Sequence, residues 1–356
     1  MSHRSLASNP GSPTRQPRWG GVVVLAPVVV VLLLAQAPLV GQAPSPATKA
    51  TTAGNASTPP RTPDGKPDLQ GIWSNGTLTP FERPKGLGTK EFYTDQEFAE
   101  QATRIRQVEV GGEDDPGAAG NGLRYNLSLY GFDLTKAKFA WNKRTSLIVG
   151  PEGVVPPMLP EAVKRNADRA AKNKGHEFDS HENRPLQERC VIMGQERLPM
   201  VPGVNDNNLL QITQAPGWVL MLHETNHHTR VIPTDGRPHI SQNIRQWQGE
   251  SVGRWEGNTL VVDTTNFTGV AANFRGSGEK LHLVERFTRV GDDTLMYQFT
   301  VEDPTTWAKP WTVEVPMTKT QGPVYEWACH EGNNMIVNIL RGARVEEEEA
   351  ARKTAK

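Results

Sequence analysis

The chain has 356 residues, of which 36% are hydrophobic and 22% charged, which suits one large or two modest folded domains. Its 39 Lys and Arg residues are balanced by 39 Asp and Glu residues. Because no basic surplus is left to bind a phosphate backbone, we expect no nucleic-acid partner. The 33 glycines, 28 prolines and nine tryptophans favour many turns between aromatic-bearing strands, and so a mainly β fold.

The N-terminus has the pattern of a targeting segment. Three arginines precede an uncharged apolar stretch at residues 20–40, and Gly41 and Ala43 then occupy the −3 and −1 positions of a cleavage site. This pattern predicts a secretory signal over residues 1–43 and export to the periplasm or the extracellular space. The alternative is an uncleaved anchor, which would be the only contact with a membrane, although Pro27 interrupts the apolar stretch.

The composition divides the rest of the chain into three parts. Residues 44–60 are small, polar and rich in proline, which predicts a disordered linker. Residues 61–344 read as a single β-rich domain, and residues 345–356 as a charged tail. The two cysteines of the chain, Cys190 and Cys329, predict one disulfide in an exported protein. A pair of buried free thiols is the alternative.

Two helices are expected at the periphery of the sheet. Thr94 and Glu97 have the spacing of a capping box and predict a helix near residues 94–107. Pro160 suits the first turn of a second, very polar helix near residues 159–173.

From about residue 209 onward the hydrophobic pattern has a period of two, which is typical of half-buried antiparallel strands. In TLMYQFTV, for example, Leu295, Tyr297, Phe299 and Val301 share one face. Turn signals such as Asp235-Gly236 and Glu256-Gly257-Asn258 separate the runs. The pattern predicts an antiparallel calycin-like or lipocalin-like barrel, with a β-sandwich as the alternative.

Six stretches occur together in one order: PDGKPDLQGIWS, HTRVIPTDGRPH, WQGESVGRWEGNTLVVDTTNF, LHLVERFTRV, VEDPTTWAKPWT and YEWACHEGN. In this combination the chain resembles a large family of exported bacterial proteins, over roughly residues 61–344. The resemblance implies export and one β-rich domain, and it assigns no catalytic role to any residue. DLQGIW is also similar to the G-x-W opening strand of lipocalins, which implies a calycin-like barrel.

Residues 218–232, WVLMLHETNHHTRVI, contain HETNH, which matches the H-E-x-x-H pattern of zinc proteases. That pattern needs a helix, because only helical spacing puts both imidazoles on one face and within reach of one metal. Here Pro216-Gly217 introduces an apolar run before the motif, and β-branched residues follow it up to Pro233. Both flanks favour strands and the Thr-Asn pair favours a turn, so we predict a β-hairpin.

The predicted hairpin carries three imidazoles within six residues, those of His223, His227 and His228. Together with His239 they are candidate ligands for a divalent metal at the rim of the sheet. The alternative is a solvated polar turn, because histidines without a fixed carboxylate partner are often surface residues. The sequence therefore requires no cofactor and leaves a divalent metal as an option.

Glu285 is the most informative carboxylate, because in LHLVERF it shares a face with leucine and phenylalanine side chains. A lone charge in such a place is costly unless it is paired. We expect a partner among Arg230, Arg245 and His330. If Glu285 lines a cavity, its pKa is raised and it can act as an acid or base. The alternative is a buried structural salt bridge.

A ligand in the interior would contact an aromatic wall to which Trp247 and Tyr297 belong, and core packing is the alternative for both. Arg230 and Arg245 are the candidates for fixing its orientation. The candidates for catalysis beside Glu285 are Glu224 and His330.

Three hypotheses of different classes follow. The first is an exported β-barrel that binds a small, partly apolar molecule in its interior. The second is a hydrolase, lyase or isomerase that uses a buried carboxylate or a rim metal. The third is a structural protein of the cell envelope. The sequence contains no G-x-x-x-x-G-K-[ST], G-x-G-x-x-G or G-x-S-x-G motif that would favour a nucleotide-binding protein or a serine hydrolase.

Overall fold

A computed structural model describes residues 59–77, 79–110, 142–150, 152–192, 198–202, 209–270 and 273–355. The predicted signal at 1–43 and nearly all of the predicted linker at 44–60 lie outside the described residues. Across the described ranges, no helix combines the length and the apolar character that a bilayer crossing requires.

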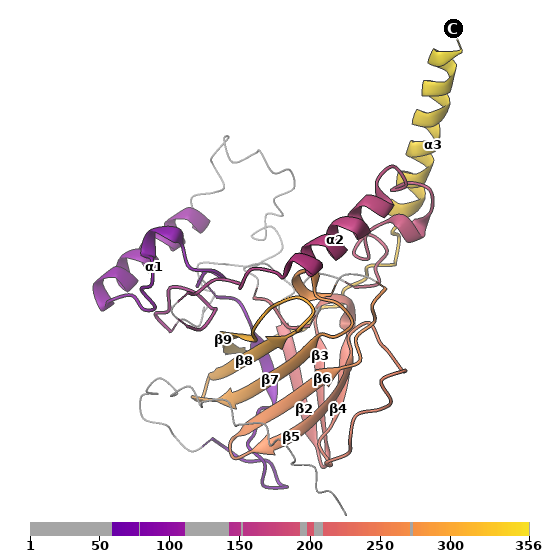
Figure 1. The fold of residues 1–356 in the computed structure, drawn as a ribbon. Helices are drawn as coiled ribbons and strands as arrows, with labels where there is room; N and C mark the ends of the chain where they lie inside the picture. Colours follow the sequence, from indigo (N-terminus) through magenta and orange to yellow (C-terminus); the bar gives the residue numbers. More distant parts are fainter. Residues whose placement is uncertain are drawn as a thin grey trace, which may run out of the picture. The chain divides into compact units, whose positions relative to one another are not determined.

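The prediction of a mainly β fold is confirmed, because nine strands form one antiparallel sheet (Figure 1). The hydrogen-bonded order is β4-β3-β2-β1-β9-β8-β7-β6-β5, with no hydrogen-bonded ladder between β4 and β5. In Figure 1 the sheet curves so that β2 to β4 lie behind β5 to β8. The strands are β1 Gly71–Ser74, β2 Leu209–Ala215, β3 Trp218–His223, β4 Thr229–Pro233, β5 Glu250–Glu256, β6 Thr259–Thr265, β7 His282–Arg289, β8 Thr294–Glu302 and β9 Trp311–Thr320.

Alternation along the strands builds the core on one face of the sheet. In β8 every second side chain is buried, and the partners of β8 in β7 and β9 follow the same rhythm. Antiparallel pairing puts Phe287 opposite Tyr297, and their rings stack with centroids 4.9 Å apart. Each fully buried aromatic or aliphatic side chain of this kind contributes about 1.5–3 kcal/mol.

The two edge strands lie next to each other although they share no ladder. A Cβ atom on Gly253 of β5 would lie 3.0 Å from the Ile232 side chain of β4, so a larger residue would force the edges apart. Arg230 of β4 donates a hydrogen bond to Ser251 of β5 at 3.0 Å. Contact between these edges therefore depends on side-chain hydrogen bonds and on the lack of a side chain at Gly253.

Three α-helices accompany the sheet, one more than the sequence predicts: α1 Asp95–Val110, α2 Pro160–Asn173 and α3 Met335–Thr354. The capping box of α1 is formed, since the Thr94 amide donates to Glu97 Oε2 at 2.8 Å and the Glu97 amide to Thr94 Oγ1 at 3.3 Å. The boundary predicted between residues 344 and 345 falls inside α3. Apolar residues at helical spacing, Ile336, Leu340 and Ala343, extend this helix well before the charged tail.

The predicted disulfide between Cys190 and Cys329 is present. It joins the segment that follows α2 to the segment between β9 and α3, across 139 positions of sequence. Cys190 is buried, and neither cysteine belongs to a strand of the sheet. The bridge is therefore the covalent tie that holds these two irregular segments together.

We predict that replacing both cysteines by serine lowers the free energy of unfolding by about 2–5 kcal/mol, because the bridge restricts a long loop in the unfolded chain. The measurement is urea unfolding of the oxidised wild type and of the Cys190→Ser/Cys329→Ser protein. Adding a reductant should lower the stability of the wild type only. A double variant as stable as the oxidised wild type would contradict this prediction.

Candidate functional site

The HETNH stretch forms a hairpin, as its flanking residues predict. β3 ends at His223, a 3-10 turn spans Thr225–His227, and β4 starts at Thr229. Asn226 and His227 have φ of 59° and 48°, a left-handed conformation that no α-helix contains. The two imidazoles of the motif therefore do not share a helical face, and this segment does not form a protease-type zinc site.

The hairpin places two of its histidines on the inner face of the sheet. His223 lies opposite His228, since the His223 amide donates to the His228 carbonyl at 2.9 Å, and Met221 lies opposite Arg230. Burial, and then the charge of Arg230, lowers the pKa of His223 well below its usual range and that of His228 to about 4. Both imidazoles are therefore neutral at neutral pH.

Arg230, Glu285 and Tyr297 form a buried polar network in the core. Arg230 donates from Nη2 to Glu285 Oε2 at 2.5 Å and from Nη1 to Oε1 at 3.2 Å, a bidentate ion pair. Tyr297 donates its hydroxyl to the same Oε1 at 2.9 Å. Burial, and then the Glu285 charge, raises the pKa of Tyr297 well above its usual value. Of the three partners expected for Glu285, Arg230 is the one that binds it.

Two hydroxyls that the sequence reasoning missed complete the network. The Arg230 Nη2 group also donates to Ser251 at 3.0 Å and to Thr264 at 3.3 Å, and the two hydroxyls lie 2.9 Å apart. They form a directly opposed pair of β5 and β6. The register set by the Glu256-Gly257-Asn258 turn was the signal that could have found them, because it pairs Ser251 with Thr264.

Two buried polar atoms of this site have no hydrogen-bond partner among the described residues: His223 Nε2 and Arg230 Nε. The side chains are only 4% and 5% exposed, so bulk water does not replace the missing partner. Leaving such an atom unpaired costs about 1–3 kcal/mol. His223 Nε2 and Arg230 Nε are two of ten such atoms among the described residues, and they share one face of the same hairpin, where a bound molecule is one physical explanation.

Glu224 and His227 anchor the hairpin instead of facing the interior. Glu224 accepts hydrogen bonds from the amides of Tyr325 at 3.1 Å and Leu209 at 3.3 Å. His227 Nε2 lies 3.0 Å from the Tyr325 carbonyl oxygen. Both side chains therefore hold the hairpin tip to the segment after β9, and Glu224 also holds it to the start of β2. The predicted acid or base Glu224 thus has a structural role.

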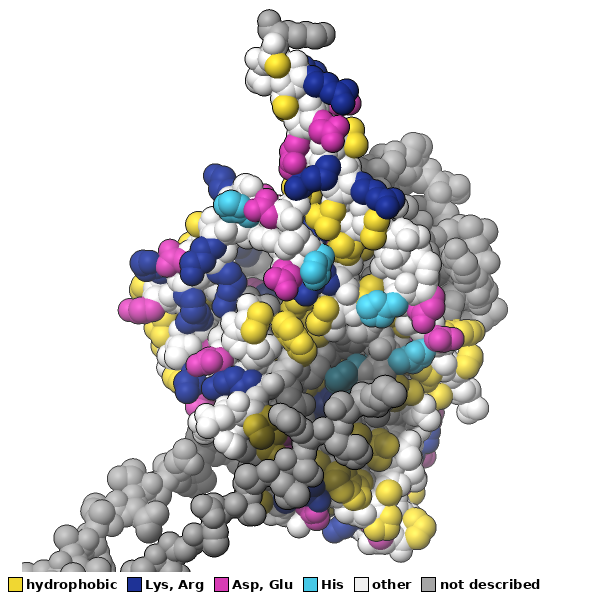
Figure 2. Space-filling view, turned by 90° about the vertical axis from the view of Figure 1, so that its right-hand side faces the viewer, with side chains coloured by type: hydrophobic (Ala, Val, Ile, Leu, Met, Phe, Trp, Pro, Cys, Tyr) yellow, Lys and Arg dark blue, Asp and Glu magenta, His cyan; other side chains and the backbone are white. Residues whose placement is uncertain are grey.

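His239 lies apart from the hairpin histidines, in a network that spans β5 to β8. Its Nδ1 bonds Glu250 and its Nε2 lies 3.1 Å from Asp263 Oδ1. His282 approaches the same oxygen at 3.0 Å and contacts Glu302 at 3.2 Å. Several histidine side chains are visible on one face of the molecule (Figure 2). The four predicted metal ligands do not converge, and within the described ranges no three His, Cys, Asp or Glu side chains are placed to hold a metal ion.

The structure also separates the remaining candidates from the interior network. Arg245 donates to the carbonyls of Phe267 and Glu279, both at 3.0 Å, and so holds two loops. Trp247 is 38% exposed, whereas Tyr297 is buried in the core. His330 is exposed beside the disulfide. Of the predicted site residues, the interior unites Glu285, Arg230, Tyr297, His223 and His228.

Comparison of the chain with models of protein families, with curated proteins and with solved structures gives no match.

We predict that Glu285→Gln lowers the free energy of unfolding by about 3–5 kcal/mol, because it leaves the Arg230 charge buried without a counter-charge. Arg230→Met together with Glu285→Gln should cost less than Glu285→Gln alone, since no unpaired charge remains while Gln still accepts from Tyr297. Urea unfolding of the two variants and the wild type measures both values. A loss below about 1 kcal/mol in the single variant would show that the pair is not buried.

The His282 network predicts a dependence of stability on pH. The hydrogen bond to Asp263 is the largest of several effects that raise the pKa of His282, so its stabilisation is complete below pH 6.5 and is lost as the pH rises through the folded-state value. Burial alone would raise the pKa of Asp263, but hydrogen bonds from His282 and His239 outweigh it and lower that pKa. The Asp263 contribution is therefore lost only in acid, as the pH falls from about 3.8 through the folded-state value.

We expect His282→Gln to destabilise the protein more at pH 5.5 than at pH 8.5. The difference should be at most about 1 kcal/mol, because solvent screens this half-exposed group. The measurement is unfolding at both pH values in the wild-type and Asp263→Asn backgrounds. The difference should shrink in the Asp263→Asn background, and an unchanged difference would assign it to other groups.

Proposed function

We propose that the protein binds a small, partly apolar and uncharged molecule inside a barrel formed by its curved sheet. The observation that carries this proposal is the pair of unpartnered atoms, His223 Nε2 and Arg230 Nε, on an inner face where a few polar groups lie among apolar side chains. Binding pockets are commonly apolar with a few convergent polar groups that fix orientation. The inner face of β3 and β4 has this composition.

Closure of the sheet at β4 and β5 would create the interior that this function needs. Support comes from the close approach of Gly253 to Ile232 and from the hydrogen bond between Arg230 and Ser251. Arg230 also extends past β5 and β6 to reach Glu285 on β7. Side-chain bonds that cross both edges can replace a missing backbone ladder, and a calycin-like arrangement agrees with this geometry.

The electrostatics of the site favour a neutral ligand. Arg230 and Glu285 neutralise each other, and His223 and His228 are uncharged. A ligand carboxylate would add a second buried negative charge near Glu285, which is costly. A hydroxyl or carbonyl oxygen can accept the Arg230 Nε hydrogen, and a hydroxyl can also donate to His223 Nε2. We therefore expect an alcohol, phenol or ketone group on an apolar body.

The acid–base alternative has less support. Glu285 is fully buried, and both of its carboxylate oxygens already accept hydrogen bonds from Arg230 or Tyr297. Few of its lone pairs are therefore free to accept a proton from a substrate. Glu224 accepts from two backbone amides. We propose that no cofactor is required. We also propose that the protein is exported, which is supported by the predicted signal and by the disulfide, because disulfides persist in oxidising compartments.

We predict that His223→Leu weakens binding of a hydroxyl ligand without destabilising the empty protein. Loss of a paired polar group weakens binding of a hydroxyl ligand at least tenfold, whereas removing an unpaired buried nitrogen raises the stability of the empty protein by up to about 3 kcal/mol. Native mass spectrometry of the purified protein detects retained molecules. Fluorescence titration with 2-naphthol, and with naphthalene as the analogue without a hydroxyl, measures the specificity.

The matched control is His330→Leu, which removes an exposed imidazole outside the interior and should change neither binding nor stability. The wild type should bind 2-naphthol more tightly than naphthalene, and His223→Leu should remove this preference. If His223→Leu is strongly destabilised and keeps the preference, the unpartnered nitrogen has a structural role and the proposal is wrong.

A further inference from the structure

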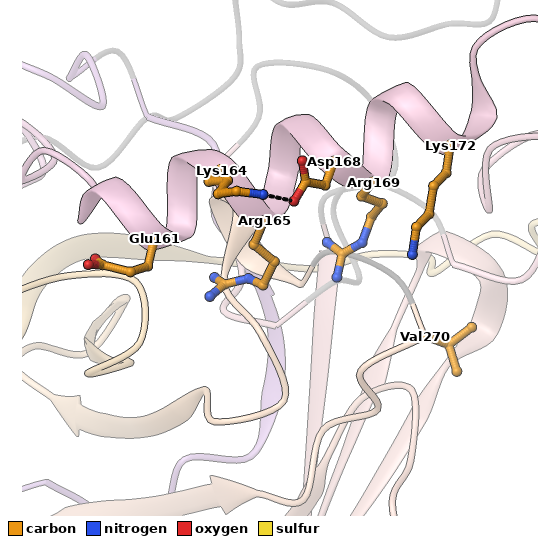
Figure 3. A pocket seen from close by; sticks show the side chains of 7 residues that line it. All are labelled: Glu161, Lys164, Arg165, Asp168, Arg169, Lys172 and Val270. Atoms are coloured by element: carbon orange, nitrogen blue, oxygen red, sulfur yellow. Dashed lines mark hydrogen bonds and ion pairs between the residues drawn. The ribbon is translucent and has the colours of Figure 1, made fainter.

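A row of three cations runs along one side of α2. Arg165, Arg169 and Lys172 follow the spacing i, i+4, i+7, which puts them within a narrow arc of the helix. Figure 3 shows the three side chains extending from the same side of the helix, the side on which Val270 also lies. They line a groove of about 570 Å³ whose other lining residues include Glu161 and Val270.

The charges of this row are not neutralised by carboxylates of the described part of the chain. Lys164 and Asp168 line the same groove and pair with each other at 2.6 Å, so Asp168 has a partner outside the row (Figure 3). Arg169 has one hydrogen bond, to Asn166 at 3.4 Å, and Lys172 has no ion pair among the described residues. Four cations and two acids line the groove in all, so its local charge is positive and suits an anion.

Hydrogen bonds hold the side chain of Arg165 in a fixed position in the groove. It donates to Thr306 Oγ1 at 2.8 Å, to the Thr305 carbonyl at 3.1 Å and to the Gly276 carbonyl at 3.3 Å. Its Nε is buried and has no partner among the described residues. One cation is thus held rigidly by two loops, while Arg169 and Lys172 project beyond it. The rigid Arg165 limits the entropy that an anion would lose on ordering the site.

We propose that the groove on α2 binds the phosphate group of an organic phosphate. Phosphate suits the row because an arginine fork binds two phosphate oxygens and a lysine adds a point charge. Val270 is 77% exposed and offers an apolar surface to the organic part of the ligand. The volume of the groove lies within the range of small-molecule sites. This site shares no residue with the interior site and does not depend on the proposed function.

The test compares Arg169→Gln/Lys172→Gln with the wild type of the full exported chain. Arg165 stays unchanged because its bonds hold the fold. Calorimetric titration with pyrophosphate measures binding of a soluble phosphate, and co-sedimentation with phosphatidylglycerol vesicles, against phosphatidylcholine vesicles, measures binding of a lipid headgroup. We expect the double variant to weaken at least one of these interactions about tenfold, as the loss of charge-assisted hydrogen bonds does.

The matched control is Lys174→Gln/Lys280→Gln, which removes the same charge from exposed lysines outside the groove and should reduce binding less than twofold. Binding of pyrophosphate identifies a soluble ligand, and binding of vesicles alone identifies a headgroup. The proposal is overturned if the wild type binds neither probe, or if the two double variants weaken binding equally. Unchanged circular dichroism of both variants excludes unfolding as the cause.

Discussion

The ion pair between Arg230 and Glu285 is the interaction on which the interior depends. Two charges inside an apolar core are tolerated only when they neutralise each other and their remaining hydrogen-bonding groups are satisfied. Glu285 meets this condition, because it accepts from both Nη atoms of Arg230 and from Tyr297. The two charged residues belong to β4 and β7. Their pairing therefore also holds the edge strand β4 close to the other edge strand, β5.

The same pair explains why one part of the interior stays polar. Arg230 uses its Nη atoms for Glu285, Ser251 and Thr264, so that Nε is left over. His223 is its neighbour on the inner face of the hairpin and is also left with an unpaired nitrogen. Two unsatisfied atoms on the same face of the hairpin reduce stability, and the proposed ligand would recover that loss by pairing with them. Under the proposed function, stability and binding are opposed at this site.

Outside the interior, polar groups are arranged in two different ways. Across β5 to β8, His239, Asp263 and His282 alternate imidazole and carboxylate, so that each charge has an opposite neighbour. Along α2 the cations outnumber the acids, and no ion pair is formed by the row from Arg165 to Lys172 within the described residues. A neutral total charge for the chain therefore conceals a local basic surface, which composition alone cannot show.

Local sequence patterns are enough to predict the strands, the hairpin in place of a zinc helix, the disulfide and the need of Glu285 for a partner. These follow from local rules: alternation, turn residues, two cysteines and the cost of an unpaired charge on an apolar face. The three-dimensional fold was needed to identify Arg230 as the cation that binds Glu285, and to show that His223 and His228 face inward while His227 and His239 bond elsewhere. The physical reason is that such choices depend on how non-adjacent strands approach each other, and the period of a strand fixes a face without fixing what lies across from it.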